Sequence, residues 1–207
     1  MDDITAIISD DAISDGYNVQ LADPAAILHS NSLKERILWI DDDIDSYSIE
    51  YIKWIISWNS EDVGKKAEDR KPIRLLFFCY GGDLDLNNAL IDTIQLSKTP
   101  IIGINVGQAD SAGCFIYLAC HKRYTFPNAQ FLIHKGSGTF SGTYETVVSQ
   151  LVNYQNSINK LGEYIINRTS IPQEEFEERF DTEWYLSAQE AVQYGMADKI
   201  IDSLDEI

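Results

Sequence analysis

The chain has 207 residues, of which 44% are hydrophobic, and its formal net charge is −17. This length is enough for one sizeable domain with a buried core. The acidic excess disfavours nucleic acid or an anionic membrane surface as a partner, and no apolar run reaches the roughly 18 residues of a membrane span. The acidic N-terminus lacks the basic region of a signal peptide, so we expect a cytoplasmic location.

The first half of the chain alternates between predicted strands and helices. Residues 1–32 show little periodicity, and we expect a partly ordered segment there. A strand ending at Ile40 is followed by a helix over Ser46–Trp58, whose isoleucines share one face. A second strand over Ile73–Cys79 ends at a glycine pair and leads into a helix over 83–98.

The alternation continues through the middle of the chain. Pro100–Val106 is a β-branched run that predicts a buried strand, and Cys114–Cys120 follows with helical spacing. Strand signal returns between Tyr124 and His134, and Ala197–Ile201 predicts a closing strand. Because strands and helices alternate, the sequence predicts an α/β fold of parallel strands joined by crossover helices, without a second domain.

The longest helical pattern begins at Tyr144. Its apolar residues recur at alternating steps of three and four, which is an a/d seam over three heptads. They are Tyr144, Val147, Leu151, Tyr154, Ile158, Leu161 and Ile165. Such a seam packs either on its own domain or against another helix, and its narrowness favours an oligomer contact. Further on, Ser187–Glu190 is a capping-box pattern that opens a helix ended by Gly195.

The three cysteines, Cys79, Cys114 and Cys120, lie within apolar runs. Their odd number and their surroundings indicate free core thiols rather than a disulfide framework or a metal site. His121 follows Cys120, and we interpret it as a histidine at a helix end. No cofactor and no metal is expected.

Ser111 lies in the stretch Gly107–Gly113, between a predicted strand and a predicted helix. A serine at a tight strand-to-helix turn holds its hydroxyl clear of the sheet, beside the unpaired N–H groups of the helix's first turn. This geometry suits a nucleophile. The alternative is that Ser111 only caps a buried helix, and Ala109 stands where a strict Gly-x-Ser-x-Gly motif has its first glycine.

Serine catalysis also needs a base, an acid that orients the base, and donors for the oxyanion. His134 ends an apolar strand, and the Gly81-Gly82 pair follows another strand end, where glycines let backbone N–H groups approach a substrate. Asp181 and Glu183 precede the last helix. Each of these residues also has a purely structural interpretation. His134 could be a hydrogen-bonded histidine of the fold, the glycine pair a plain turn, and each acid a solvent-exposed charge.

In the order glycine pair, serine, histidine, acid, these signals resemble the Clp protease proteolytic subunit, ClpP, from Leu33 to the last strand. The strongest matches are Gly107-Gln108-Ala109-x-Ser111-x-Gly113, Pro127-Asn128 with Ile133-His134, and Leu186-Ser187-Ala188-x-Glu190-Ala191 with Tyr194-Gly195 and Asp198. The resemblance implies a ClpP/crotonase-like α/β fold of repeated β-β-α units with a projecting handle helix at about 143–168. It implies one serine peptidase domain over 33–207, preceded by a divergent segment over 1–32.

By position in the motifs, the resemblance implies that Ser111 is the nucleophile and His134 the general base. It implies that the backbone N–H groups of Gly82 and Ala112 form the oxyanion hole, with Gly81 adjacent.

Two carboxylates remain candidates for the third catalytic residue. Glu183 falls on the family's aspartate when the chain is counted back from Leu186 without a gap, and Asp181 is the fallback. The chain departs from the family pattern at Tyr80, where the family usually has proline, and at Asp110, where it has a small neutral residue. A carboxylate at 110 would oppose oxyanion formation if it pointed inward.

The implied function is a self-compartmentalising serine endopeptidase that hydrolyses unfolded polypeptides. The family assembles with itself into rings, usually of seven subunits and stacked in pairs as a tetradecamer, with the handle helix between rings. A hexameric AAA+ unfoldase is a possible partner. The alternatives are a weakly active or inactive ring subunit and, less favoured, a crotonase-type acyl-CoA enzyme.

Overall fold

The computed structural model describes residues 23–207, and the first 22 residues of the predicted N-terminal segment lie outside this range. The described residues fall into two units, residues 23–35 and residues 36–207. The first contains helix α2 (Pro24–Lys34), which the sequence analysis did not predict. Asp23 caps this helix by accepting from the Ala25 N–H at 3.1 Å, and Pro24 occupies the first turn, where a missing N–H costs nothing.

The second unit is built on a sheet whose seven strands all lie within residues 36–207. The strands are β1 (Ile37–Ile40), β2 (Ile73–Cys79), β3 (Ile101–Asp110), β4 (Lys122–Thr125), β5 (Gln130–Ile133), β6 (Trp184–Ser187) and β7 (Lys199–Ile200). The helices of this unit are α3 (Ile49–Glu61), α4 (Leu84–Leu96), α5 (Ala112–Ala119), α6 (Tyr144–Arg168), α7 (Gln173–Arg179) and α8 (Ala188–Gln193). Short 3-10 turns lie at Ser46–Ser48, Ala67–Asp69 and Leu204–Glu206.

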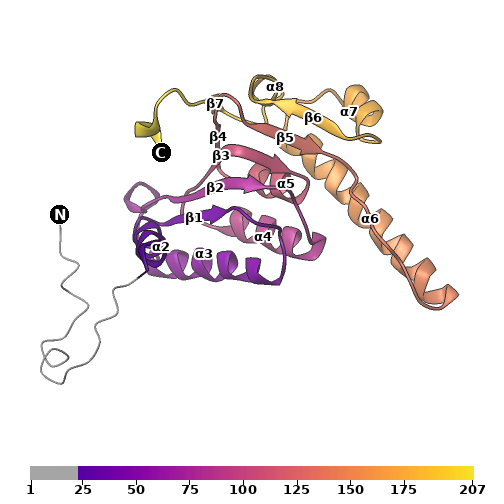
Figure 1. Cartoon of the computed structure of the whole chain (residues 1–207), viewed down its shortest axis with the longest axis horizontal. Helices are drawn as coiled ribbons and strands as arrows, with labels where there is room; N and C mark the ends of the chain where they lie inside the picture. The colour runs from indigo at the N-terminus through magenta and orange to yellow at the C-terminus, as the bar shows by residue number, and fades with distance from the viewer. Residues whose placement is uncertain (1–22) are drawn as a thin grey trace, which may run out of the picture. The chain divides into compact units, whose positions relative to one another are not determined.

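Strand β3 is shared between two parts of the sheet. Its first half pairs with β4, so that Ile102 lies opposite Lys122, and the order β1-β2-β3-β4-β7 is parallel throughout. Its second half pairs in parallel with β5, so that Asp110 lies opposite Leu132. Strand β6 then adds to β5 in antiparallel orientation. The end of β3 therefore pairs with β5, and β6 lies on the other side of β5, so that these strands form a branch of the sheet (Figure 1).

Helix α5 forms the centre of the core. All eight of its residues are buried, including Tyr117, whose ring contacts those of Phe77 and Phe131. Because a helix with no polar face can only be stable when surrounded, its start at Ala112 is fixed by packing on all sides. Its first turn therefore provides a rigid position for any group that follows β3.

Helix α6 extends away from the sheet at its N-terminal end (Figure 1). Its C-terminal half packs on the domain, with Ile158, Leu161 and Ile165 buried. In its N-terminal half most apolar residues are exposed, Tyr144 by 80% and Leu151 by 54%, while Val147 is partly buried. The predicted seam is therefore half intramolecular and half open to solvent in the single chain.

Candidate active site

Ser111 occupies the turn between β3 and α5 in a backbone conformation that L-residues rarely adopt. Its φ is 51° and its ψ is −122°. The turn is held because the Ser111 N–H donates to Leu132 O at 2.9 Å, and the Phe115 N–H donates to Ser111 O at 3.1 Å. The Ser111 side chain makes no capping hydrogen bond to α5. Strained non-glycine residues of this kind cluster at functional sites, and helix capping does not explain this one.

The glycine pair lies directly against this turn. Gly81 and Gly82 have φ values of 119° and 142°, a region that favours glycine. A Cβ on Gly81 would lie 2.7 Å from the Cβ of Ser111, and one on Gly82 would lie 2.3 Å from Ile44 O. Ile44 fixes the pair from the other side, because its N–H donates to Gly81 O and its carbonyl accepts from the Asp83 N–H, both at 2.7 Å.

Two backbone N–H groups remain available beside the serine. The pairing with Ile44 uses the Gly81 carbonyl and the Asp83 N–H, so the Gly82 N–H makes no hydrogen bond within residues 23–207. Ala112 is the first residue of α5, where N–H groups have no partner in the helix. Donors of this kind stabilise an oxyanion formed at an adjacent carbonyl.

The pairing of β5 with β6 brings a histidine and a carboxylate together. Ile133 lies opposite Trp184 in an antiparallel register, so the next residues outward, His134 and Glu183, are neighbours across the two strands. The His134 Nδ1 lies 3.3 Å from the Glu183 Oε1. The Glu183 side chain is 60% exposed and that of His134 22%. A carboxylate at Nδ1 leaves the Nε2 of the imidazole free to act as a base.

The two candidate carboxylates have different partners. Glu183 Oε2 accepts from the Tyr185 hydroxyl at 3.0 Å, a contact that raises the pKa of Tyr185 and fixes the carboxylate beside His134. Asp181 instead forms an ion pair with Lys135. Of the two, Glu183 is therefore the carboxylate at the imidazole.

Ser111 and His134 line the same cavity, which has a volume of about 250 Å³. Gly82 and Ala112 contribute the backbone that carries the free N–H groups. The other walls are mainly aromatic or aliphatic side chains: Tyr80, Leu84, Phe115, Tyr154, Ile158 and Leu161. The sequence analysis did not include the α6 residues or Lys135, although the apolar seam marked Tyr154, Ile158 and Leu161 as contact residues.

Asp110 does not face this cavity. Its side chain is buried, with 4% of the residue exposed, and it is absent from the cavity lining. Burial raises the pKa of its carboxyl, while a hydrogen bond from Gln108 opposes the shift. The inward-pointing carboxylate that would oppose an oxyanion is therefore not present in this arrangement.

The cysteines are free and buried, as the sequence indicates. Burial raises the pKa of Cys79 to about 11 and that of Cys120 to about 12. Thiols with such pKa values hold too little thiolate at neutral pH to act as nucleophiles. The buried thiols therefore do not compete with Ser111 as a candidate nucleophile.

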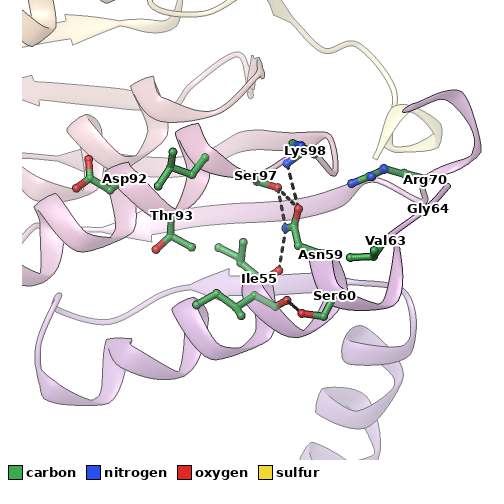
Figure 2. A pocket seen from close by; sticks show the side chains of 12 residues that line it. Ile55, Asn59, Ser60, Val63, Gly64, Arg70, Asp92, Thr93, Ser97 and Lys98 are labelled. Carbon is green, nitrogen blue, oxygen red and sulfur yellow. Dashed lines mark hydrogen bonds between the residues drawn. The ribbon is translucent and has the colours of Figure 1, made fainter. Parts of the chain in front are cut away.

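A larger hollow of about 510 Å³ lies between α3 and α4 and shares no residue with the Ser111 cavity (Figure 2). Asn59 lies at its centre and is fully bonded. Its amide donates to Ile55 O and to Ser97 Oγ at 2.9 and 2.8 Å, and its carbonyl oxygen accepts from the Lys98 N–H at 3.0 Å. Asn59 therefore joins the end of α3 to the turn after α4, which is a structural role.

Within residues 23–207, no helix combines the length and the apolarity needed to cross a bilayer.

The sheet is branched and parallel except for β6, and it carries a strained serine at a strand-to-helix turn, two free amides and an imidazole beside a carboxylate. These features belong to an α/β fold of the ClpP/crotonase-like class. Comparison with known proteins gives the family. The model of the Clp protease family matches residues 24–204, so the chain belongs to that family. A ClpP1 point mutant from Listeria monocytogenes is similar in structure, with a TM-score of 0.72 and 23% sequence identity. The match covers 86% of this chain and 98% of the Listeria chain. The expected family and fold are confirmed.

Proposed function

We propose that this protein is a serine endopeptidase of the ClpP type. The observation that carries the proposal is the meeting of three distant segments at one cavity. Ser111 follows β3, His134 follows β5 and Glu183 precedes β6, and the first two line the cavity while the third contacts the imidazole. This is the arrangement of nucleophile, base and orienting acid that acyl transfer requires.

In the proposed reaction, Ser111 Oγ attacks the peptide carbonyl carbon while His134 Nε2 takes the hydroxyl proton. The oxyanion is bound by the N–H groups of Gly82 and Ala112. His134 then gives the proton to the leaving amine, the C–N bond breaks, and an acyl-enzyme remains. Water, deprotonated by the same imidazole, releases the acyl group. Glu183 holds the imidazole in the tautomer with its proton on Nδ1.

The Ser111 side chain makes no hydrogen bond in the part of the chain that the structure describes. Catalytic hydrogen bonds are often long or absent without substrate and tighten in the complex. The apolar walls of the cavity favour a substrate with an apolar side chain at the scissile residue.

The proposal extends to assembly. The family forms rings, and the exposed apolar half of α6 is a surface that stacking of two rings would cover. We propose that the chain works in such a chamber in the cytoplasm, on unfolded polypeptide, with an ATP-dependent unfoldase as a possible partner.

Labelling with a fluorophosphonate tests the catalytic part. We expect covalent modification at Ser111 and loss of both labelling and peptide hydrolysis in Ser111→Ala. Ser137→Ala is the matched control, because Ser137 lines the same cavity without the strained turn or the free amides. If the assembled protein is not labelled and Ser111→Ala behaves like the wild type, the peptidase proposal is wrong. A non-catalytic ring subunit would then be the better interpretation.

A further inference from the structure

Strand register places a second carboxylate on the face of the sheet that carries His134. Asp110 on β3 lies opposite Leu132 on β5, which lies opposite Tyr185 on β6. Side chains alternate between faces along a strand, so residues two apart share a face. His134 follows Leu132 by two positions and Glu183 precedes Tyr185 by two. Because β5 lies between β3 and β6, the two carboxylates lie on opposite sides of β5. Glu183 lies beside His134 itself, whereas Asp110 lies beside Leu132, two positions before His134.

Asp110 is an unusual residue to bury. Its Oδ2 accepts from Gln108 Nε2 at 2.7 Å, whereas its Oδ1 is buried without a hydrogen-bond partner among residues 23–207. A carboxylate left with one oxygen unsatisfied away from water is unfavourable unless a positive charge lies nearby. Packing alone would be served by a smaller apolar residue at this position. The side chain therefore needs a partner that the hydrogen bonds do not supply.

The groups that interact electrostatically with Asp110 come from every element around it. They are Cys79 at the end of β2, Cys114 in α5, His134 after β5, and Glu183 and Tyr185 at β6. The two thiols and the phenol are neutral near pH 7, since burial raises the pKa of each thiol and the contact with Glu183 raises that of the phenol. His134 is the one member of this set that can become a cation.

The influences on the pKa of Asp110 include the charge of His134, in agreement with this geometry. Burial raises the pKa of its carboxyl, and the hydrogen bond from Gln108 and a positive charge on His134 lower it, while Glu183 raises it again. By linkage, a negative charge on Asp110 must favour the protonated imidazole by the same free energy.

We propose that Asp110 is a positioning residue for His134, acting from the β3 side and sharing with Glu183 the stabilisation of the imidazolium formed during acyl transfer. The proposal rests on the proposed function for its catalytic meaning, but the coupling between the two side chains is measurable without catalysis.

The first test is the NMR titration of the imidazole signals in the full-length protein. The chain has three histidines, so His134→Gln identifies the signal. We expect Asp110→Asn to move the titration midpoint of His134 to lower pH by about half a unit or more. Asp92→Asn, which removes one exposed carboxylate from α4, controls for net charge and should leave the midpoint in place.

Asn at 110 keeps an acceptor for Gln108 and the shape of the side chain. Should this variant fail to fold, Asp110→Ala provides the same test, because it removes the charge, although it also removes the acceptor of the Gln108 side chain and lowers the side-chain volume. An unchanged His134 midpoint in a folded Asp110 variant would overturn the proposal, since a merely structural carboxylate would not move it.

The second test is kinetic. If the wild type hydrolyses peptides, the acid limb of the kcat/KM profile of Asp110→Asn should shift to lower pH by the same amount, while the plateau falls several-fold. The Asp110→Asn, Glu183→Gln double variant should lose more than the product of the two single losses, because either carboxylate partly replaces the other. Strictly multiplicative losses would contradict the shared role. A wild type without activity would refute the proposed function, and the titration would still decide on Asp110.

Discussion

Replacing Glu183 by Gln measures how much the proposed peptidase activity depends on the carboxylate at the imidazole. The substitution keeps the length of the side chain and an oxygen that can accept from Nδ1, and it removes the negative charge. We expect kcat/KM for peptide hydrolysis to fall about tenfold, which corresponds to about 1.4 kcal/mol of transition-state stabilisation.

The magnitude follows from the distance and the exposure of the pair. Unit charges 3.3 Å apart interact by about 1.3 kcal/mol in bulk water and by about 5 kcal/mol at an effective dielectric constant of 20. Because 60% of the Glu183 side chain is exposed, solvent screening places the pair near the lower value. A buried acid in the same role is worth about 10⁴ in kcat, so the expected loss is much smaller than for a closed triad.

The assay is steady-state hydrolysis of a fluorogenic peptide at two ionic strengths. An exposed charge is screened by salt, so the ratio of wild-type to Glu183→Gln activity should shrink at the higher ionic strength. Asp181→Asn removes the other candidate carboxylate, which pairs with Lys135, and should cost less than about twofold. A 1,000-fold loss in Glu183→Gln, or equal losses in the two variants, would refute the reasoning.

Three further changes test the frame around the site. Asp62→Asn should destabilise the fold by about 3 kcal/mol in urea unfolding, because it removes the buried carboxylate that binds the buried Arg36 at 2.6 Å and leaves that arginine with the more exposed Glu61 as its ion-pair partner. Arg36 holds the pKa of Asp62 far below its ordinary range, so the loss of stability should persist at every pH above about 4 and shrink only in stronger acid. Asp69→Asn, which removes an exposed carboxylate, should have little effect on stability. Gly82→Ala should lower kcat at least about 100-fold by displacing an oxyanion donor, whereas Gly64→Ala, which also has a positive φ but open space around an added Cβ, should not. Leu151→Glu on the exposed half of α6 should reduce the mass of the proposed ring assembly in sedimentation.

The elements with strong local signals were predictable from sequence. Strand β2 and the first part of β3 are largely apolar runs that follow a proline, and α4 follows a glycine pair and an Asp cap. The predicted strand ended at Val106, whereas β3 continues to Asp110, because Gln108–Asp110 pair with neighbouring strands although they carry little apolar signal. Strand β6 was not predicted, because it has four residues and its alternation of buried and exposed positions is too short to recognise. Its pairing with β5 depends on residues about 50 positions earlier. Because that register brings Glu183 to His134, sequence alone left Asp181 as an alternative.

The long helix shows a second limit of periodicity. The seam from Tyr144 to Ile165 has one spacing throughout, yet Ile158 and Leu161 are buried in their own domain while Leu151 is exposed. The spacing of apolar residues predicts that one face of a helix is buried, but it does not predict whether its own domain or another chain covers that face. Only the position of the sheet relative to the helix separates the intramolecular half from the half left for another chain.

Ser111 illustrates why the site as a whole is more informative than any one motif. The sequence could not separate a helix cap from a nucleophile, because both place a serine at the start of α5. In the structure the serine has a φ of 51° and makes no capping bond, while the glycine pair beside it approaches so closely that a Cβ on Gly81 would overlap Ser111. Each feature costs conformational free energy and gives no packing in return. A turn that only stabilised the fold would avoid both the strained serine and the close glycine pair. Catalysis would require both, because the Ser111 hydroxyl would have to reach a carbonyl group whose oxygen accepts from two backbone N–H groups.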